Sequence, residues 1–312
     1  MVEIFKTVNN QTISSQIGEE NIVIYLTNPT EEELTLVQEH HQVELDFLKA
    51  ALDQEEVSRV EIEDNQSLIL INAPIEEVED KQDISYNTMP VGIINTAKAV
   101  IVVTLENLTA LKIFKDKYKF KANTNKKTRF VLQLIYEISI QYLRELRKID
   151  RFIDSIEDKL VEDIQNDYII QLMTLEKNLV YFSTALKTNA QVLRRVIRTR
   201  TLEIYEEDED LIDDTLIEIG QAQEMATINS EIVRSLRDAT ASIISNNLNK
   251  VMKILASFTI ILTVPTMIFS FFGMNTYLGF LETTNIGTLL IFSCSLLIAL
   301  IIFIIMRKKN MF

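Results

Sequence analysis

The sequence predicts an α+β protein with three parts: an α/β domain, a long helical region and two apolar helices near the carboxyl end. Three observations carry this prediction. Short apolar runs alternate with helical patterns up to about residue 125. From Thr128 onward, about 120 residues are nearly free of glycine and proline, which is typical of long helices. Two uncharged apolar runs then follow Lys253.

Strands and helices alternate within the first predicted domain, residues 1–126. One helix should begin after Thr30, because Thr30 and Glu33 have the spacing of a capping box, and a second should run through Leu45–Leu52. Runs rich in β-branched residues predict strands at Val2–Phe5, Ile22–Leu26, Arg59–Glu63, Ser67–Ile71, Val91–Asn95 and Ala99–Thr104. This order of elements favours a compact α/β domain.

The second predicted region, residues 127–250, contains long helices. The first pair is expected at Lys127–Glu162 and Asp167–Thr199. A third helix opens near the acidic run that ends at Asp214 and continues into the first apolar run, since no Gly or Pro lies between Gly220 and Pro265. From Asp213 to Phe272 it would be about 90 Å long. Such a helix packs in a monomeric bundle or against copies of itself, and we favour an oligomer because two spans cannot enclose a polar pathway alone.

Residues 251–312 form the predicted transmembrane domain. The spans are expected at about 254–273 and 287–306, joined by an outer loop, 274–286, because about 20 apolar residues cross a hydrocarbon core. Lys250 and Lys253 precede the first span and Arg307–Lys309 follow the second, whereas the loop has no basic residue. Since positive charge stays inside, both termini should be cytoplasmic.

Composition excludes several classes of function. The net charge of -14 argues against a nucleic-acid partner, which needs a basic surface. An acidic surface suits binding of cations, and the alternative is that the acidic residues only keep a large surface solvated. We find no phosphate-binding Gly-rich loop, no nucleophile beside a base and no His–carboxylate cluster, so no enzyme is indicated. The two histidines, His40 and His41, are expected on the surface.

One face of the third helix carries alternating polar and apolar residues. We call this set the pore stripe. Its members recur at heptad spacing through the entry to the first span: Asp238, Ser245, Leu248, Met252, Leu255, Thr259, Leu262 and Thr266. In a parallel bundle they would line the axis, and Asp238 would concentrate cations at its inner end. The alternative is ordinary packing within a helix bundle.

The tripeptide Gly273-Met274-Asn275 ends the first span, precedes a short loop and a second span, and lies about 40 residues before the last residue. This arrangement resembles the CorA family of divalent-cation channels and transporters, and the resemblance extends upstream through Ser245–Leu255. It implies a homopentamer in which the matching stretch lines the pore. Apolar rings there form a gate that closes by dewetting, and Gly-Met-Asn forms the outer selectivity ring.

The tripeptide also has a chemistry of its own. Mg²⁺ gives up its waters reluctantly, and the Asn275 amide oxygen can accept hydrogen bonds from coordinated waters. Gly273 permits a tight turn at the helix end, and Met274 packs behind it; a glycine cap followed by ordinary loop residues is the alternative. Zinc-transporting relatives vary the middle residue, so Met274 favours magnesium.

Two departures from the family pattern concern the same region. Phe272 stands where many members have Tyr, and Leu281-Glu282 lacks the usual proline. Glu282 either attracts cations or is a passive loop acid.

The resemblance further implies that cytoplasmic Mg²⁺ bridges acids of adjacent subunits and closes the channel. Counting back from Gly-Met-Asn places the helix member of that pair at Asp214. Its partner falls on Ala50, with Asp53 nearby as a substitute. The acidic cluster from Glu206 to Asp214 is an alternative, diffuse site.

The expected function is therefore Mg²⁺ influx across the cell membrane, driven by the membrane potential and gated by cytoplasmic Mg²⁺, with Co²⁺ and Ni²⁺ as further candidate ions. One alternative is a zinc transporter of the same architecture, with or without proton coupling. The other is a membrane-anchored scaffold that transports nothing. The function of such a scaffold would not depend on Asn275, because an anchor needs only apolar length.

Overall fold

The computed structural model describes residues 1–9, 11–63, 65–79, 83–111, 123–162, 165–274 and 285–309. They divide into two compact units, Met1–Arg237 and Asp238–Phe312. Helix α6 (Glu209–Phe272) begins in the first unit and ends in the second. The long uninterrupted helix predicted from the lack of breakers is thus confirmed.

A seven-stranded sheet organises the first unit, in the order β2-β1-β3-β7-β6-β5-β4. Among the described strands, β3 and β7 are the one parallel pair. Its strands are β1 (Val2–Val8), β2 (Gln11–Ser14), β3 (Ile22–Thr27), β4 (Arg59–Glu63), β5 (Gln66–Glu79), β6 (Asp83–Asn95) and β7 (Ala99–Thr104). All six predicted strands are present. The sequence did not reveal β2, because its four residues are exposed and mostly polar.

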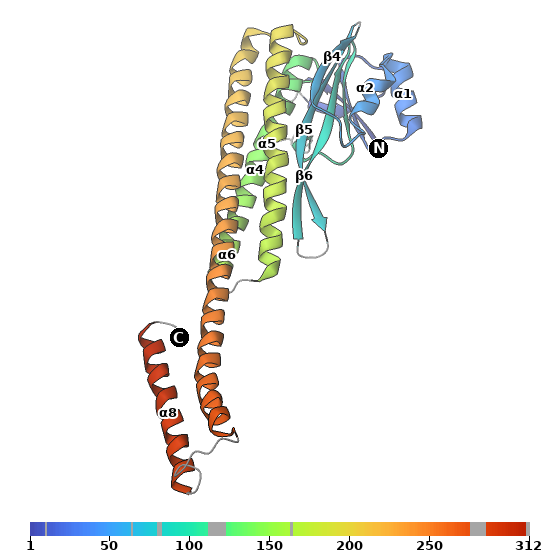
Figure 1. Cartoon of the computed structure of the whole chain (residues 1–312). Coiled ribbons are helices and arrows are strands. Elements are labelled where there is room, and N and C mark those ends of the chain that lie inside the picture. Colours follow the sequence, from blue (N-terminus) through green and yellow to red (C-terminus); the bar gives the residue numbers. More distant parts are fainter. Residues whose placement is uncertain are drawn as a thin grey trace. The chain divides into compact units, whose positions relative to one another are not determined.

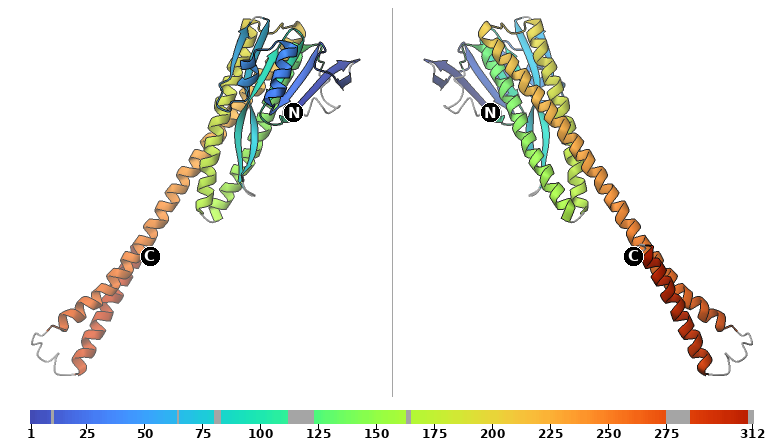
Figure 2. Two further views of the ribbon diagram at one scale, coloured as in Figure 1. Left: turned by 90° about the vertical axis from the view of Figure 1, so that its right-hand side faces the viewer. Right: turned by 90° about the vertical axis from the view of Figure 1, so that its left-hand side faces the viewer.

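Helices cover both faces of this sheet (Figures 1 and 2). On one face α1 (Glu31–His41) and α2 (Leu45–Ala50) enclose a core that includes Ile22, Ile24 and Leu26 of β3. The alternate β3 residues, Val23 and Tyr25, point to the opposite core under α4 (Lys127–Glu162), α5 (Asn166–Thr199) and the first part of α6. Because successive side chains of a strand point to opposite faces of the sheet, β3 contributes residues to two cores, one on each side. The unit therefore has three layers. The capping box predicted at Thr30 is present.

The β5–β6 hairpin is longer than the two strands predicted for it. It pairs from Ser67↔Asn95 to Glu79↔Asp83, beyond the ends of β4 and β7. Pro74 and Pro90 lie within it, paired with Thr88 and Asn72. Each proline nitrogen faces outward from the hairpin, so neither removes a ladder hydrogen bond. Because prolines often mark strand ends, the strands predicted from the sequence are shorter than the observed ones.

Two asparagines of α5 bind the outward-facing backbone of this hairpin. Asn189 Nδ2 donates to Asn72 O at 2.7 Å, and Asn72 N–H donates to Asn189 Oδ1 at 2.9 Å. In the orientation that satisfies its neighbours, the Asn178 amide donates to Tyr86 O at 2.9 Å and accepts from Tyr86 N–H at 3.0 Å. Each side-chain amide thus replaces a missing neighbouring strand.

The prediction that both histidines lie on the surface is correct for His40 and wrong for His41. His40 is exposed, but His41 is only 8% exposed. Its Nε2 lies 2.7 Å from the carbonyl oxygen of Ile17, and burial lowers the pKa of the ring. The two residues are adjacent on one helix and point in different directions, so sequence alone could not tell which one would be covered.

The second unit contains the end of α6 and helix α8 (Asn285–Lys308). The two helices lie side by side (Figure 1), and the rings of Phe269 and Phe292 stack at 6.2 Å between centroids. Two segments, Glu206–Phe272 and Leu289–Lys308, are long and apolar enough to cross a membrane. Within the chain, only 6% and 17% of their most apolar windows are buried. These windows therefore need another apolar environment, unlike the core helix of a soluble protein.

Candidate ion pathway

All eight residues of the pore stripe lie on α6, and all are exposed in the single chain. The large apolar members are 55–66% exposed: Leu248 61%, Met252 55%, Leu255 59% and Leu262 66%. Residues seven apart drift by only about 20° around an α-helix, so the set forms one continuous face. Exposed leucines on a membrane-entry helix need a partner surface, which the isolated chain does not supply.

The side chains that the single chain covers lie on another face of α6. Ser257 is fully buried, and Ile261, Val264 and Ile268 are half-buried. At about 100° per residue, these four positions lie on the helix face roughly opposite the pore stripe. The single chain thus leaves the stripe residues exposed, and Phe269, seven residues beyond Leu262, stacks on Phe292 of α8.

The stripe threonines keep a free acceptor side. Thr259 Oγ1 donates to Leu255 O at 2.9 Å, and Thr266 Oγ1 donates to Leu262 O at 2.8 Å. Because each hydroxyl proton points back into the helix, its oxygen lone pairs remain for outside donors. The water ligands of a hydrated cation are such donors.

The helix end at Gly273 is tight. Gly273 N–H donates to Phe269 O at 2.9 Å, and a Cβ at position 273 would lie 3.1 Å from that same oxygen. Met274 is exposed beyond it. Asn275 and Glu282, which the sequence places in the filter and the outer loop, lie outside the described residues.

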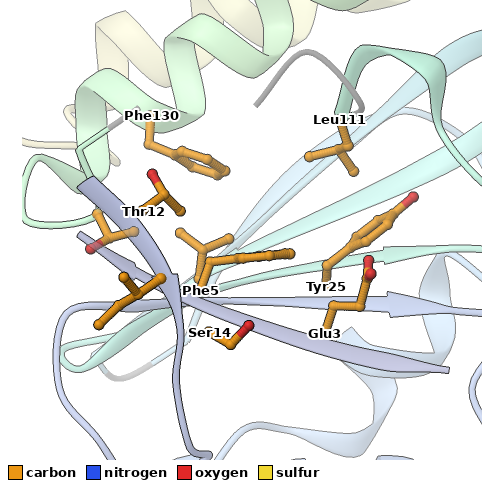
Figure 3. Close-up of a pocket in the computed structure, with 10 residues that line it drawn as sticks. Glu3, Phe5, Thr12, Ser14, Tyr25, Leu111 and Phe130 are labelled. Carbon is orange, nitrogen blue, oxygen red and sulfur yellow. The ribbon is translucent and has the colours of Figure 1, made fainter. Parts of the chain in front are cut away.

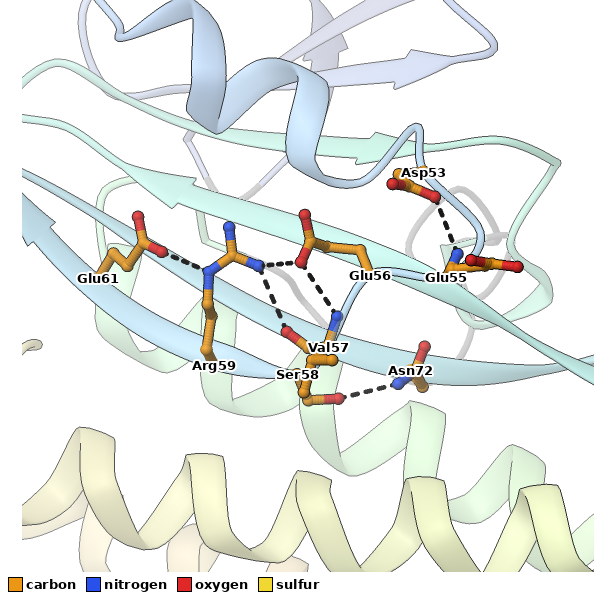
Figure 4. A network of polar contacts seen from close by, with 8 residues as sticks. All are labelled: Asp53, Glu55, Glu56, Val57, Ser58, Arg59, Glu61 and Asn72. Carbon is orange, nitrogen blue, oxygen red and sulfur yellow. Dashed lines mark hydrogen bonds and ion pairs between the residues drawn. The ribbon is translucent and has the colours of Figure 1, made fainter.

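The predicted regulatory acids lie in separate elements. Asp214 is exposed in the second turn of α6. Asp53 is exposed between α2 and β4, where its Oδ1 accepts from Glu55 N–H at 3.0 Å (Figure 4). Beside it, Arg59 pairs with Glu56 and Glu61.

Part of the acidic cluster is already neutralised. Glu207 pairs with Lys126 at 2.5 Å, and the buried Asp208 pairs with Arg129 at 3.1 Å. Over the ranges that the structure describes, no group of three or more His, Cys, Asp or Glu side chains is placed to hold a metal.

An apolar cavity of about 230 Å³ opens beside β1, β2 and β3 (Figure 3). Phe5, Tyr25, Leu111 and Phe130 line it, and Glu3 is the one ionisable acid among its lining residues. This composition suits neither a cation pathway nor a metal, so the pore stripe is the better candidate site.

Sequence reasoning missed one ionic contact close to the stripe. Glu176 of α5 binds Arg237 and Arg234 of α6, just before Asp238. Glu176 lies 58 residues before Arg234 and 61 residues before Arg237. No local sequence pattern therefore links the acid to the two bases.

Comparison with known proteins decides the family. The family described as "CorA-like Mg2+ transporter protein" matches residues 19–308. The cobalt/magnesium transport protein CorA of Methanocaldococcus jannaschii is 30% identical over 302 residues, covering 91% of this chain and 89% of that protein. The chain belongs to the CorA-like Mg²⁺ transporter family. It is accordingly a magnesium transporter of the CorA type and not an enzyme, and the resemblance carried by Gly-Met-Asn is confirmed.

Solved structures agree on the fold. The complete CorA magnesium transporter of M. jannaschii superposes with a TM-score of 0.84 at 23% identity, covering 100% of this chain and 99% of that one. The cytoplasmic domain of ZntB from Vibrio parahaemolyticus gives a TM-score of 0.57 at 14% identity, covering 78% of this chain and 98% of that one. The whole fold is thus shared with the complete CorA structure, and its cytoplasmic part also with the ZntB domain. The fold alone therefore does not select the ion.

Proposed function

We propose that this CorA-type protein is a homopentameric channel in which hydrated Mg²⁺ passes along the pore stripe of five α6 helices. The observation that carries the proposal is the exposed stripe itself. Its polar and apolar residues share one exposed face of an apolar helix, and the opposite face carries the side chains that the single chain buries. Five such faces around an axis would give alternating hydrophilic and hydrophobic rings.

Asp238 would gather cations at the inner end, and Ser245, Thr259 and Thr266 would accept hydrogen bonds from the ion's waters. Leu248, Met252, Leu255 and Leu262 would form constrictions that close by dewetting. Gly273, Met274 and Asn275 would form the outer filter, with Glu282 near its entrance. Co²⁺ and Ni²⁺ are further candidate ions.

Orientation and driving force follow from charge. Lys250 and Lys253 flank the first span, and Arg307–Lys309 flank the second, which favours cytoplasmic termini in the cell membrane. A membrane potential supplies about 2.3 kcal/mol per charge per 100 mV. Inward movement of a divalent ion then needs no ATP-driven motor.

The gate can be tested by substitution on one face of the helix. Leu255→Ser places a hydroxyl in a proposed constriction, so easier wetting should raise the initial rate of Mg²⁺ uptake into proteoliposomes by about three-fold or more. Ile260→Ser is the matched control, because Ile260 is also exposed and lies about 140° further round the helix. Equal effects of both variants, or none from Leu255→Ser, would contradict the proposed pathway.

Cytoplasmic Mg²⁺ is proposed to act as a regulatory ligand at Asp214, with Asp53 of a neighbouring copy as the partner. The exposure of both carboxylates leaves them accessible for an intersubunit bridge. Asp214→Ala should weaken inhibition of uptake by internal Mg²⁺, shifting half-inhibition to about ten-fold higher concentration, which corresponds to about 1.4 kcal/mol. An unchanged inhibition curve would exclude this bridge.

The zinc alternative is not favoured, because the matching family and the curated relative are magnesium or cobalt/magnesium transporters. The likeness to ZntB is one of fold. The scaffold alternative is not favoured by membership of a transporter family.

A further inference from the structure

We propose that a phosphate group, free or carried by a nucleotide, binds in the cavity at the start of α4. Every residue of this site belongs to the unit Met1–Arg237, so the site does not depend on the ion pathway proposed above.

The cavity has a volume of about 330 Å³, which lies within the range of small-molecule sites. The first turn of α4 supplies Lys127, Thr128 and Arg129 to its wall, and the segment before α6 supplies Glu203 and Tyr205. A helix start, basic side chains and an aromatic ring therefore meet around one space.

The start of α4 leaves three backbone donors unpaired. The first bond of the helix runs from Phe130 N–H to Lys126 O at 2.9 Å. In the described part of the chain, no oxygen accepts from the N–H groups of the three residues between them, Lys127, Thr128 and Arg129. Lys126 cannot cap them, because its side chain has no acceptor. Unpaired donors at the positive end of a helix favour an anion.

Thr128 gives a second, independent indication of a ligand. It lines the cavity and is only 8% exposed, yet its hydroxyl has no hydrogen-bond partner among the described residues. The buried Thr124 differs, because its hydroxyl accepts from Thr7 N–H at 2.9 Å. A buried hydroxyl without a partner costs free energy. An oxygen of a bound phosphate would accept its proton.

Lys127 supplies a positive charge that no acid neutralises within the described ranges. The other two bases of the wall, Lys126 and Arg129, each pair with a carboxylate. Lys127 Nζ instead donates to the carbonyl oxygens of Thr96 and Ala97, at 2.8 and 2.7 Å, and these carry no net charge. Burial lowers the pKa of this ammonium. A phosphate beside it would compensate the charge.

Two further groups of the wall concern the ligand's identity and affinity. The ring of Tyr205 is 52% exposed, so it offers an aromatic face to a nucleotide base. Glu203 is exposed and accepts from the Tyr205 hydroxyl. Its negative charge opposes an anion in the cavity, so Glu203→Gln should tighten phosphate binding, which a misfolded protein would not do.

The experiment is isothermal titration calorimetry of the full chain in detergent, in Mg²⁺-free buffer, with ADP, inorganic phosphate and adenosine as the probes. ADP and phosphate should bind and adenosine should not, because the phosphate group carries the recognition. A lower Kd for ADP than for phosphate identifies a nucleotide as the source of the group, and equal values identify free phosphate.

The variants follow from the geometry. Thr128→Val should raise the Kd for ADP by about ten-fold or more, because it removes a hydrogen bond to a charged group. Thr128→Ser, which keeps the hydroxyl, should bind as the native chain does. Glu203→Gln should lower the Kd by about three-fold. Lys127→Met should weaken binding, and Lys187→Met, which removes an exposed base of α5, is its matched control and should not.

Thr128→Val breaks no hydrogen bond within the described chain, so it should keep the native Tm, and weaker binding cannot then be a loss of folding. Failure of the native chain to bind ADP or phosphate at millimolar concentration would overturn the proposal. The same Kd in the native chain and in Thr128→Val, or adenosine binding as tight as that of ADP, would also overturn it.

Discussion

At the residue scale, burial separates side chains that look equivalent in the sequence. His40 and His41 are neighbours on α1, yet only His41 is buried, with Nε2 against the Ile17 carbonyl. Asn178 and Asn189 likewise read as ordinary helix polar residues, but each binds a strand edge. Their roles depend on contacts across 24 to 117 residues of chain, which no local pattern encodes.

The buried histidine gives the soluble unit a pH dependence. Burial lowers the pKa of His41 below its ordinary value of 6.5. As pH falls through the unfolded-state pKa, the unfolded chain takes up a proton that the folded chain does not, so the free energy of unfolding decreases. The loss should reach up to about 1.4 kcal/mol per pH unit below pH 6.5.

Thermal unfolding followed by circular dichroism between pH 7.5 and 5.0 checks this. His41→Gln should flatten the fall in Tm, and His40→Gln, on the exposed neighbour, should not. The same pH slope in native protein and His41→Gln would contradict the role given to burial.

Among the site residues, heptad spacing was enough to place the pore stripe on one exposed face. The Glu176 contact with Arg234 and Arg237 was not predictable, because it depends on how α5 packs against α6.

At the element scale, long helices were easier to predict than strands. The predicted bounds of α4 are those observed, and α5 differs by one residue, because breakers and capping patterns mark helix ends locally. The β5–β6 hairpin was underestimated, since Pro74 and Pro90 resemble strand ends. Whether a proline faces a partner strand or open space is set by the sheet, not by the proline's neighbours.

The asparagine contacts between α5 and this hairpin should be worth a measurable part of the stability. Asn178→Ala would leave the buried N–H and C=O of Tyr86 without partners, at a cost of about 2–4 kcal/mol. Its Tm should fall by several degrees, whereas Gln191→Ala, exposed on the same helix, should change stability by less than about 0.5 kcal/mol. A native Tm for Asn178→Ala would show that the hairpin edge does not need this amide.

At the scale of the whole molecule, function depends on surfaces that a single chain leaves uncovered. The apolar windows of both candidate spans are largely exposed, and so is every residue of the pore stripe. Membership of the CorA-like family supplies the transported ion. The path through the protein is the proposal that joins these observations.

The most direct test of that path is Mg²⁺ uptake into proteoliposomes by the native chain and by Asn275→Ala, at several internal Mg²⁺ concentrations. Thr283→Ala, in the same predicted outer loop, is the control. We expect native uptake that falls as internal Mg²⁺ rises, loss of uptake by about ten-fold or more in Asn275→Ala because the filter oxygen is missing, and native behaviour in Thr283→Ala. Undiminished Mg²⁺ uptake by Asn275→Ala, or zinc uptake without magnesium uptake by the native chain, would contradict the account.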